Sequence, residues 1–77
     1  MTIDKIKEIL PKEIYQHWMN CKDLQKMQAA LKELRWMLDN QKELLLTFDL
    51  VNRYNAEIEL LEKRTSKIES SEIRALW

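Results

Sequence analysis

None of the 77 residues of this chain is glycine. Turns of types I′, II and II′ place a residue at positive φ, which glycine does without steric cost. Loops that cradle phosphate groups also depend on glycine. β-Hairpins, β-meanders and glycine-rich nucleotide sites are therefore excluded together, and we expect an all-α fold, a small helical bundle.

The length and the charge of the chain narrow the choice further. We expect residues 1–77 to form one helical domain, or one arm of an oligomer, because two separate cores would each be too small. The 13 basic and 13 acidic residues give a net charge of +0, so no broad field attracts nucleic acid or an anionic membrane. The single cysteine cannot form an internal disulfide, no apolar run approaches the ~18 residues of a membrane span, and no signal peptide is recognisable. We therefore expect a cytoplasmic protein with no membrane partner.

Two short helices are expected near the N-terminus, over about residues 3–19. Thr2 can cap the first helix, and apolar residues at helical spacing continue to Leu10. Pro11 disfavours helical geometry at the residue before it and suits the first position of a second helix, which we extend to about Met19. The alternative is one helix kinked at Pro11, at a cost of roughly 3 kcal/mol.

The rest of the chain has the pattern of an antiparallel, coiled-coil-like helical hairpin, over about residues 21–39 and 41–68. Apolar residues recur at helical spacing along one face of each segment. They are Leu24, Met27, Leu31, Leu34 and Leu38 in the first segment, and Leu44, Phe48, Val51, Tyr54, Ile58 and Leu61 in the second. Residues 69–77 are expected to form a tail or an extension of the second helix.

Polar residues predict where the hairpin helices begin. The segment from Asn20 to Asp23 is expected to cap the first helix, with the Asp23 carboxylate inside its first turn. We expect the chain to reverse near Asn40, where Glu43 three residues later resembles a capping box. Because glycine is missing, Asn20 and Asn40 are also the natural residues for a left-handed conformation.

The second hairpin helix is too long for a compact domain of this size. A helix over residues 41–68 measures roughly 42 Å, whereas a compact globule of this chain length is about 30 Å across. An overhanging amphipathic helix needs a partner, and a second copy of the chain is the simplest one. The pattern therefore favours a homodimer.

Apolar residues away from the main stripes are the candidate interface residues. Trp36 points about 160° away from the stripe of its helix, so either the N-terminal helices bury it or it anchors a partner. The three consecutive leucines 44–46 cannot all face one seam, so this region either lies inside the bundle or forms a surface for self-association or for a partner helix. The last two residues are either idle or a docking tail. The full set of interface candidates is Trp36, Leu45, Leu46, Leu50, Leu60, Leu76 and Trp77.

No set of residues suggests catalysis. His17 and Cys21 lie four residues apart, but two ligands do not make a zinc site, and no second pair exists in the sequence. No glycine-built oxyanion loop accompanies them, which argues against a nucleophile pair as well. We expect no enzyme, no metal site and no cofactor.

These expectations converge on a small regulator or inhibitor that binds a partner protein through exposed apolar helix faces, and that is itself a homodimer. One alternative is a dimeric DNA-binding regulator of helix-turn-helix type, because a short turn near Asn20 separates two predicted helices. Its recognition residues would be Lys22, Gln25, Lys26 and Lys32. The neutral charge and the long leucine seam count against a nucleic-acid partner. A third alternative is a structural assembly subunit whose helices serve only to oligomerise.

Overall fold

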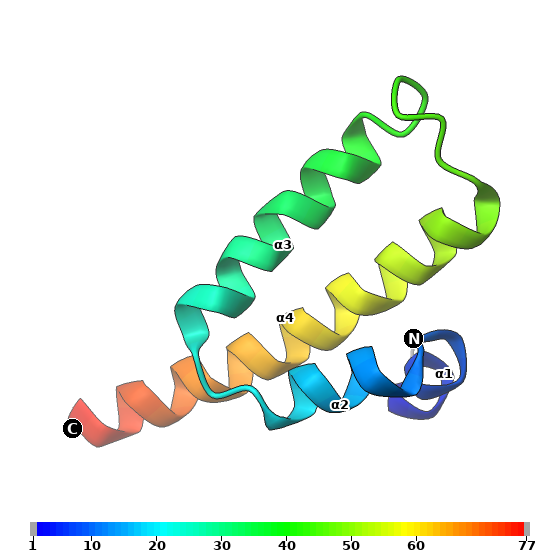
Figure 1. Cartoon of the computed structure of the whole chain (residues 1–77). Helices are drawn as coiled ribbons and strands as arrows, with labels where there is room; N and C mark the ends of the chain where they lie inside the picture. Colours follow the sequence, from blue (N-terminus) through cyan, green and yellow to red (C-terminus); the bar gives the residue numbers. More distant parts are fainter. Residues whose placement is uncertain (1, 77) are drawn as a thin grey trace.

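The computed structural model describes the backbone of residues 2–76 and the side chains of residues 2–68. Over this range it contains four α-helices and no strand (Figure 1). The helices are α1 (Ile3–Ile9), α2 (Lys12–Asn20), α3 (Leu24–Asp39) and α4 (Phe48–Leu76). The expected all-α helical bundle is confirmed.

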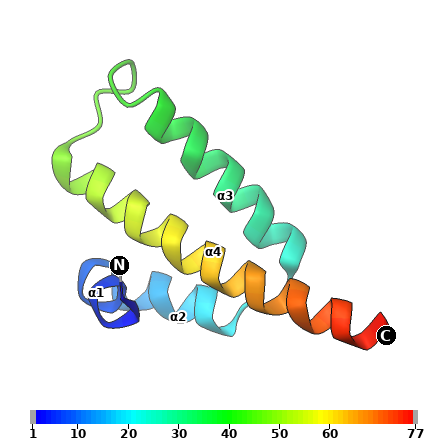
Figure 2. The ribbon, with the colours of Figure 1, turned by 180° about the vertical axis from the view of Figure 1, so that it is seen from behind.

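The long helix α4 is the centre of the molecule, and each of the other three helices packs on it. α3 lies along one side of α4, whereas α1 and α2 lie along the other, as the views from the front and from behind show (Figures 1 and 2). The 29 residues of α4 span roughly 43 Å, close to the 46 Å length of the molecule. The radius of gyration of 13.5 Å exceeds the ~11.5 Å of a compact globule of this chain length. The C-terminal end of α4 projects beyond the other helices, so the molecule is elongated (Figure 1).

Two separate apolar clusters hold the helices together, one on each side of α4. The cluster between α3 and α4 contains Met27, Leu31, Leu34, Ile58 and Leu61, and the cluster between α1 and α4 contains Ile6, Leu10, Ala56 and Leu60. The α4 members of the two clusters lie on opposite faces of the helix, because successive residues rotate by about 100°. α4 is therefore buried from both sides along its middle.

Two polar contacts fasten α2 and the turn after it to α4. The indole Nε1 of Trp18 donates a hydrogen bond of 2.7 Å to Oε1 of Glu57. Nη2 of Arg64 donates a bond of 3.2 Å to the carbonyl oxygen of Cys21. Both contacts join residues that are far apart in the sequence, so they fix the path of the chain between α2 and α3.

The break between α1 and α2 falls at Pro11, as the sequence predicts. Thr2 caps α1, because its Oγ1 accepts a bond of 3.3 Å from the backbone N–H of Lys5. α1 ends at Leu10, whose N–H donates to the Ile6 carbonyl, and Pro11 then has an extended ψ of 144°. Pro11 occupies the cap position of α2 rather than its first helical position. The single kinked helix is thus excluded.

The second hairpin helix does not begin at Gln41, contrary to the sequence prediction. Residues 40–45 form successive turns, residues 46–47 follow without regular structure, and α4 begins only at Phe48. The physical reason is the Thr47 side chain, whose Oγ1 accepts a bond of 3.2 Å from the N–H of Leu50 and so caps the helix there.

The predicted roles of the polar end residues also need correction. Asn40 ends α3 instead of starting the next helix, because its side-chain Nδ2 donates a bond of 2.8 Å to the Trp36 carbonyl. The capping box with Glu43 is therefore wrong. Asp23 is the N-cap of α3 itself, with Oδ1 accepting a bond of 3.3 Å from the N–H of Lys26. Asn20 lies inside α2, and the left-handed residue within the described chain is Leu45, at φ 54°.

The C-terminal part of α4 extends the second hairpin helix, which continues to Leu76. Of the two expectations for residues 69–77, the extension is therefore the correct one as far as the described backbone goes. Within that described range, no helix combines the length and the apolar character that crossing a membrane requires.

Candidate interaction surfaces

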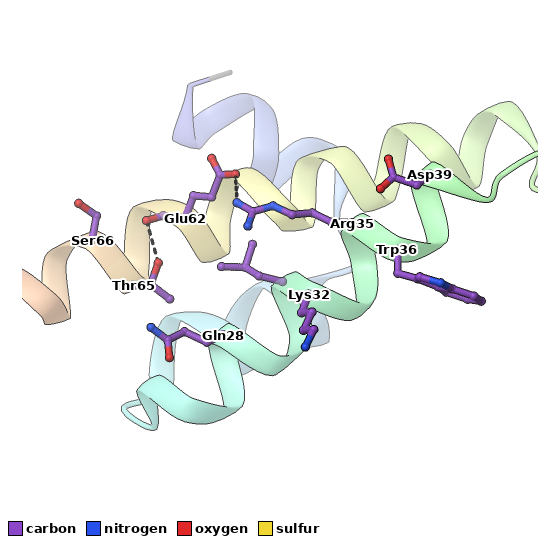
Figure 3. Close-up of a pocket in the computed structure, with 9 residues that line it drawn as sticks. Gln28, Lys32, Arg35, Trp36, Asp39, Glu62, Thr65 and Ser66 are labelled. Atoms are coloured by element: carbon purple, nitrogen blue, oxygen red, sulfur yellow. Dashed lines mark hydrogen bonds and ion pairs between the residues drawn. The ribbon is translucent and has the colours of Figure 1, made fainter.

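Trp36 lies on the outer side of α3, turned away from α4 (Figure 3). Its side chain is 57% exposed. α1 and α2 cannot cover it, because they pack on the opposite side of α4 (Figure 1). The alternative in which the N-terminal helices bury Trp36 is therefore wrong.

A second exposed apolar surface lies where the chain passes from α3 to α4. Leu44, Leu45 and Phe48 are 41%, 85% and 85% exposed, and we call these three residues the tip patch. Two of them belong to the connecting turns and the third is the first residue of α4. Exposed side chains of this size in one place are characteristic of interaction sites.

The remaining leucines predicted for the interface differ in their burial. Leu46 and Leu50 are half-buried beside the tip patch. Leu60 is completely buried, because α1 covers this side of α4 with Ile6 and Leu10. Leu60 is therefore a core residue, and its prediction as an interface residue is wrong. The side chains of Leu76 and Trp77 lie outside the described residues.

The sequence analysis missed Leu44 and Phe48 as surface residues. Both have the right spacing to continue the apolar stripe of α4, so they were predicted to be core. The available signal is Thr47 followed by Asp49, which is the usual order of an N-cap hydroxyl and an acidic residue in the first turn. A helix that begins there leaves Leu44 outside it and Phe48 at its first position.

The side of α3 that faces away from α4 carries a mixture of charged and apolar residues, which we call the outer face of α3. All its members are exposed: Gln25, Lys26, Ala29, Lys32, Glu33 and Trp36. Four of them line a shallow depression, in which Ala29 lies one helical turn from Lys32 and Glu33 and two turns from Trp36. A small residue beside a large aromatic one gives this face both a hollow and a projection.

A groove of about 650 Å³ runs between α3 and α4, and Figure 3 shows its lining. Nη2 of Arg35 and Oε1 of Glu62 form an ion pair of 2.7 Å that joins the two helices across it. Both side chains are about half exposed, at 56% and 50%. The other two charged residues that line the groove, Lys32 and Asp39, carry opposite charges. The groove therefore has no net charge that would select an anionic or a cationic ligand.

His17 and Cys21 have different neighbours in the structure. The His17 ring lies edge-on to Trp18, with 4.7 Å between ring centroids, and the Cys21 thiol donates a long bond of 3.9 Å to the Asp23 carbonyl. Among the residues whose side chains are described, no group of three His, Cys, Asp or Glu side chains could hold a metal ion.

The residues of the DNA-binding alternative are all exposed. Lys22, Gln25, Lys26 and Lys32 lie on α3 or in the turn just before it. In a helix-turn-helix unit, however, the two helices pack on each other, whereas here α2 and α3 each pack mainly on α4. The acidic Glu33 also lies on the same outer face. The arrangement gives a DNA-binding role little support.

No protein-family model, no curated protein and no solved structure matches the chain. Its function therefore has to be inferred from its own surfaces.

Proposed function

We propose that this chain is a non-catalytic, cytoplasmic interaction protein that binds a partner protein through the tip patch, acting as a regulator or inhibitor, and that it works as a homodimer. The observation that carries the proposal is the 85% exposure of both Leu45 and Phe48. Burying a Leu or Phe side chain stabilises a complex by about 1.5–3 kcal/mol, so two such residues in one place favour binding of an apolar surface.

The backbone at Leu45 supports the same conclusion. Leu45 has φ 54°, in the left-handed region, where a residue with a Cβ atom is disfavoured by about 1–2 kcal/mol. Glycine or asparagine would suit this position better. A leucine that is both strained and exposed contributes little to the stability of the monomer. We therefore infer that its side chain serves binding.

Half-buried apolar residues are close to the tip patch in the sequence. They are Leu46, Leu50 and Val51, and each keeps part of its side chain accessible. An apolar partner helix could therefore extend its contact from the tip patch along the start of α4.

Affinity capture with a matched pair of variants tests this proposal. The tagged protein is crosslinked in extract, and the captured proteins are compared quantitatively for wild type, Leu45→Glu/Phe48→Glu and Ile3→Glu/Met19→Glu. The control variant, Ile3→Glu/Met19→Glu, also introduces two negative charges, at apolar residues of α1 and α2 that are 39% and 37% exposed and do not belong to the tip patch. We expect the tip variant to lose a defined protein that the control variant still captures. The proposal is wrong if the tip variant is folded by circular dichroism and captures the same proteins as wild type.

A further inference from the structure

The outer face of α3 carries two basic residues and one acidic residue, Lys26, Lys32 and Glu33, at positions where a second copy can form opposite-charge pairs with them. Viewed down the helix axis, Lys26 and Glu33 lie on the same side of Ala29, rotated from it by about 60° and 40°. Gln25 and Lys32 lie on the other side, at about 40° and 60°. Glu33 has Ala29, Ala30, Trp36 and Met37 at spacings of three and four, so its own helix offers it no basic partner.

We propose that a second copy of this chain packs on the outer face of α3, with the two α3 helices antiparallel and a twofold axis beside Ala29. This inference rests on the homodimer in the proposed function and identifies the surface that forms it. In such a pair, the two helices touch along a line that passes Ala29. A residue that lies before Ala29 in one copy meets a residue that lies equally far after Ala29 in the other copy, provided that both lie on the same side of this line. Lys26 lies three residues before Ala29 and Glu33 four residues after it. Lys26 of each copy therefore faces Glu33 of the other, with an offset of about 1.5 Å along the helix.

Ala29 and Trp36 supply the apolar part of this contact. The small Ala29 side chain lets the two helices approach closely where they cross. Trp36, two turns further along, then lies over the start of α3 in the second copy. The exposed Lys22 is seven residues before Ala29 and lies at that end, where its ammonium group can contact the indole face. A tryptophan that is 57% exposed in one chain becomes the anchor of the pair.

The helix dipoles favour the antiparallel direction over the parallel one. The dipoles of two antiparallel helices attract each other, whereas those of parallel helices repel. The ion pairs do not decide the direction by themselves. In a parallel pair Glu33 would face Lys32 and Lys26 would face Gln25, whereas in the antiparallel pair Lys26 faces Glu33 and Lys32 faces Gln25. The two directions therefore differ in which lysine is paired with Glu33. The α3 contact also leaves the tip patch of both copies accessible, so a partner protein can still bind there.

Charge exchange between two variants tests this arrangement. Lys26→Glu and Glu33→Lys each place like charges opposite one another, and each change acts twice because the contact is symmetric. We expect both variants to raise the dissociation constant of the dimer about tenfold or more, measured by sedimentation equilibrium at low salt. An equimolar mixture of the two variants, and the double variant Lys26→Glu/Glu33→Lys, restore every opposite-charge pair and should dimerise again. Lys12→Glu, on the far side of α4, carries the same charge change as a control and should dimerise like wild type.

Each other outcome has a definite meaning. The proposed arrangement is overturned if wild type is monomeric at every concentration, if Lys12→Glu dissociates as the variants do, or if the mixture stays monomeric. It is also overturned if Glu33→Lys alone weakens the dimer, which is the result for a parallel pair.

The tip variant separates the α3 dimer from the partner site. If Leu45→Glu/Phe48→Glu, but neither α3 variant, abolishes the dimer, the second copy binds at the tip patch and not at α3. If the α3 variants behave as expected while the tip variant captures the same proteins as wild type, the α3 dimer stands and the partner site at the tip fails.

Discussion

Among single residues, Leu45 and Trp36 are exposed side chains that contribute little to the core of the monomer. Trp36 lies on the solvent side of α3, and Leu45 keeps a left-handed backbone in a chain that has no glycine. The sequence identifies both as candidates, because each lies out of phase with the apolar stripe of its segment. It could not decide between burial and exposure for Trp36. That outcome depends on which side of α4 the N-terminal helices occupy.

The strain at Leu45 predicts an unusual stability effect. Leu45→Asn should raise the free energy of unfolding by about 0.5–1 kcal/mol, because asparagine tolerates the left-handed conformation and the leucine side chain is hardly buried. Leu44→Asn makes the same chemical change one residue earlier, where φ is not positive, and should give no gain. Chemical denaturation of both variants measures the difference. A loss of stability at Leu45→Asn larger than that at Leu44→Asn would contradict the role of backbone strain.

At the scale of helices, the apolar period predicts all four elements but not their ends. The repeat from Leu24 to Leu38 locates α3 correctly, since each of these side chains is at least half-buried. The same reasoning wrongly extends α4 back to Gln41, because Leu44 is in phase with Phe48. Periodicity cannot tell a helix that packs on a neighbour from a turn whose leucines happen to have helical spacing. The end of α3 depends instead on one side chain, Asn40, bonding to the Trp36 carbonyl.

One substitution tests where α4 starts, because the two possible starts predict different changes in the free energy of unfolding. If Thr47 is the N-cap, Thr47→Ala removes the bond to the Leu50 N–H and should lower the free energy of unfolding by about 1 kcal/mol. If the helix began at Gln41, Thr47 would be a helix-interior residue, and the same change would be neutral or stabilising by about 0.5 kcal/mol. Thr47→Ser keeps the hydroxyl and should stay close to wild type. Thermal and urea unfolding of the three proteins distinguish the two cases.

In the molecule as a whole, α4 contributes residues to two apolar clusters, while the outer face of α3 and the tip patch stay uncovered. Leu60 illustrates what a sequence pattern cannot resolve. It lies off the main stripe of α4, which suggests an interface, but α1 of the same chain covers it. The elongated shape was predictable from the length of the last apolar pattern. The tip patch was only partly predictable, because Phe48 counts as core until Thr47 is identified as the cap.

We propose that this chain works as an assembled protein, with a second copy as its first partner. Light scattering after size exclusion, at increasing concentrations of the wild-type protein, measures whether that second copy binds. We expect the mass to rise with concentration from the 9.4 kDa of one chain towards twice that value. A mass that stays at 9.4 kDa up to the highest concentration would contradict the claim, because the outer face of α3 would then have no second copy to cover it.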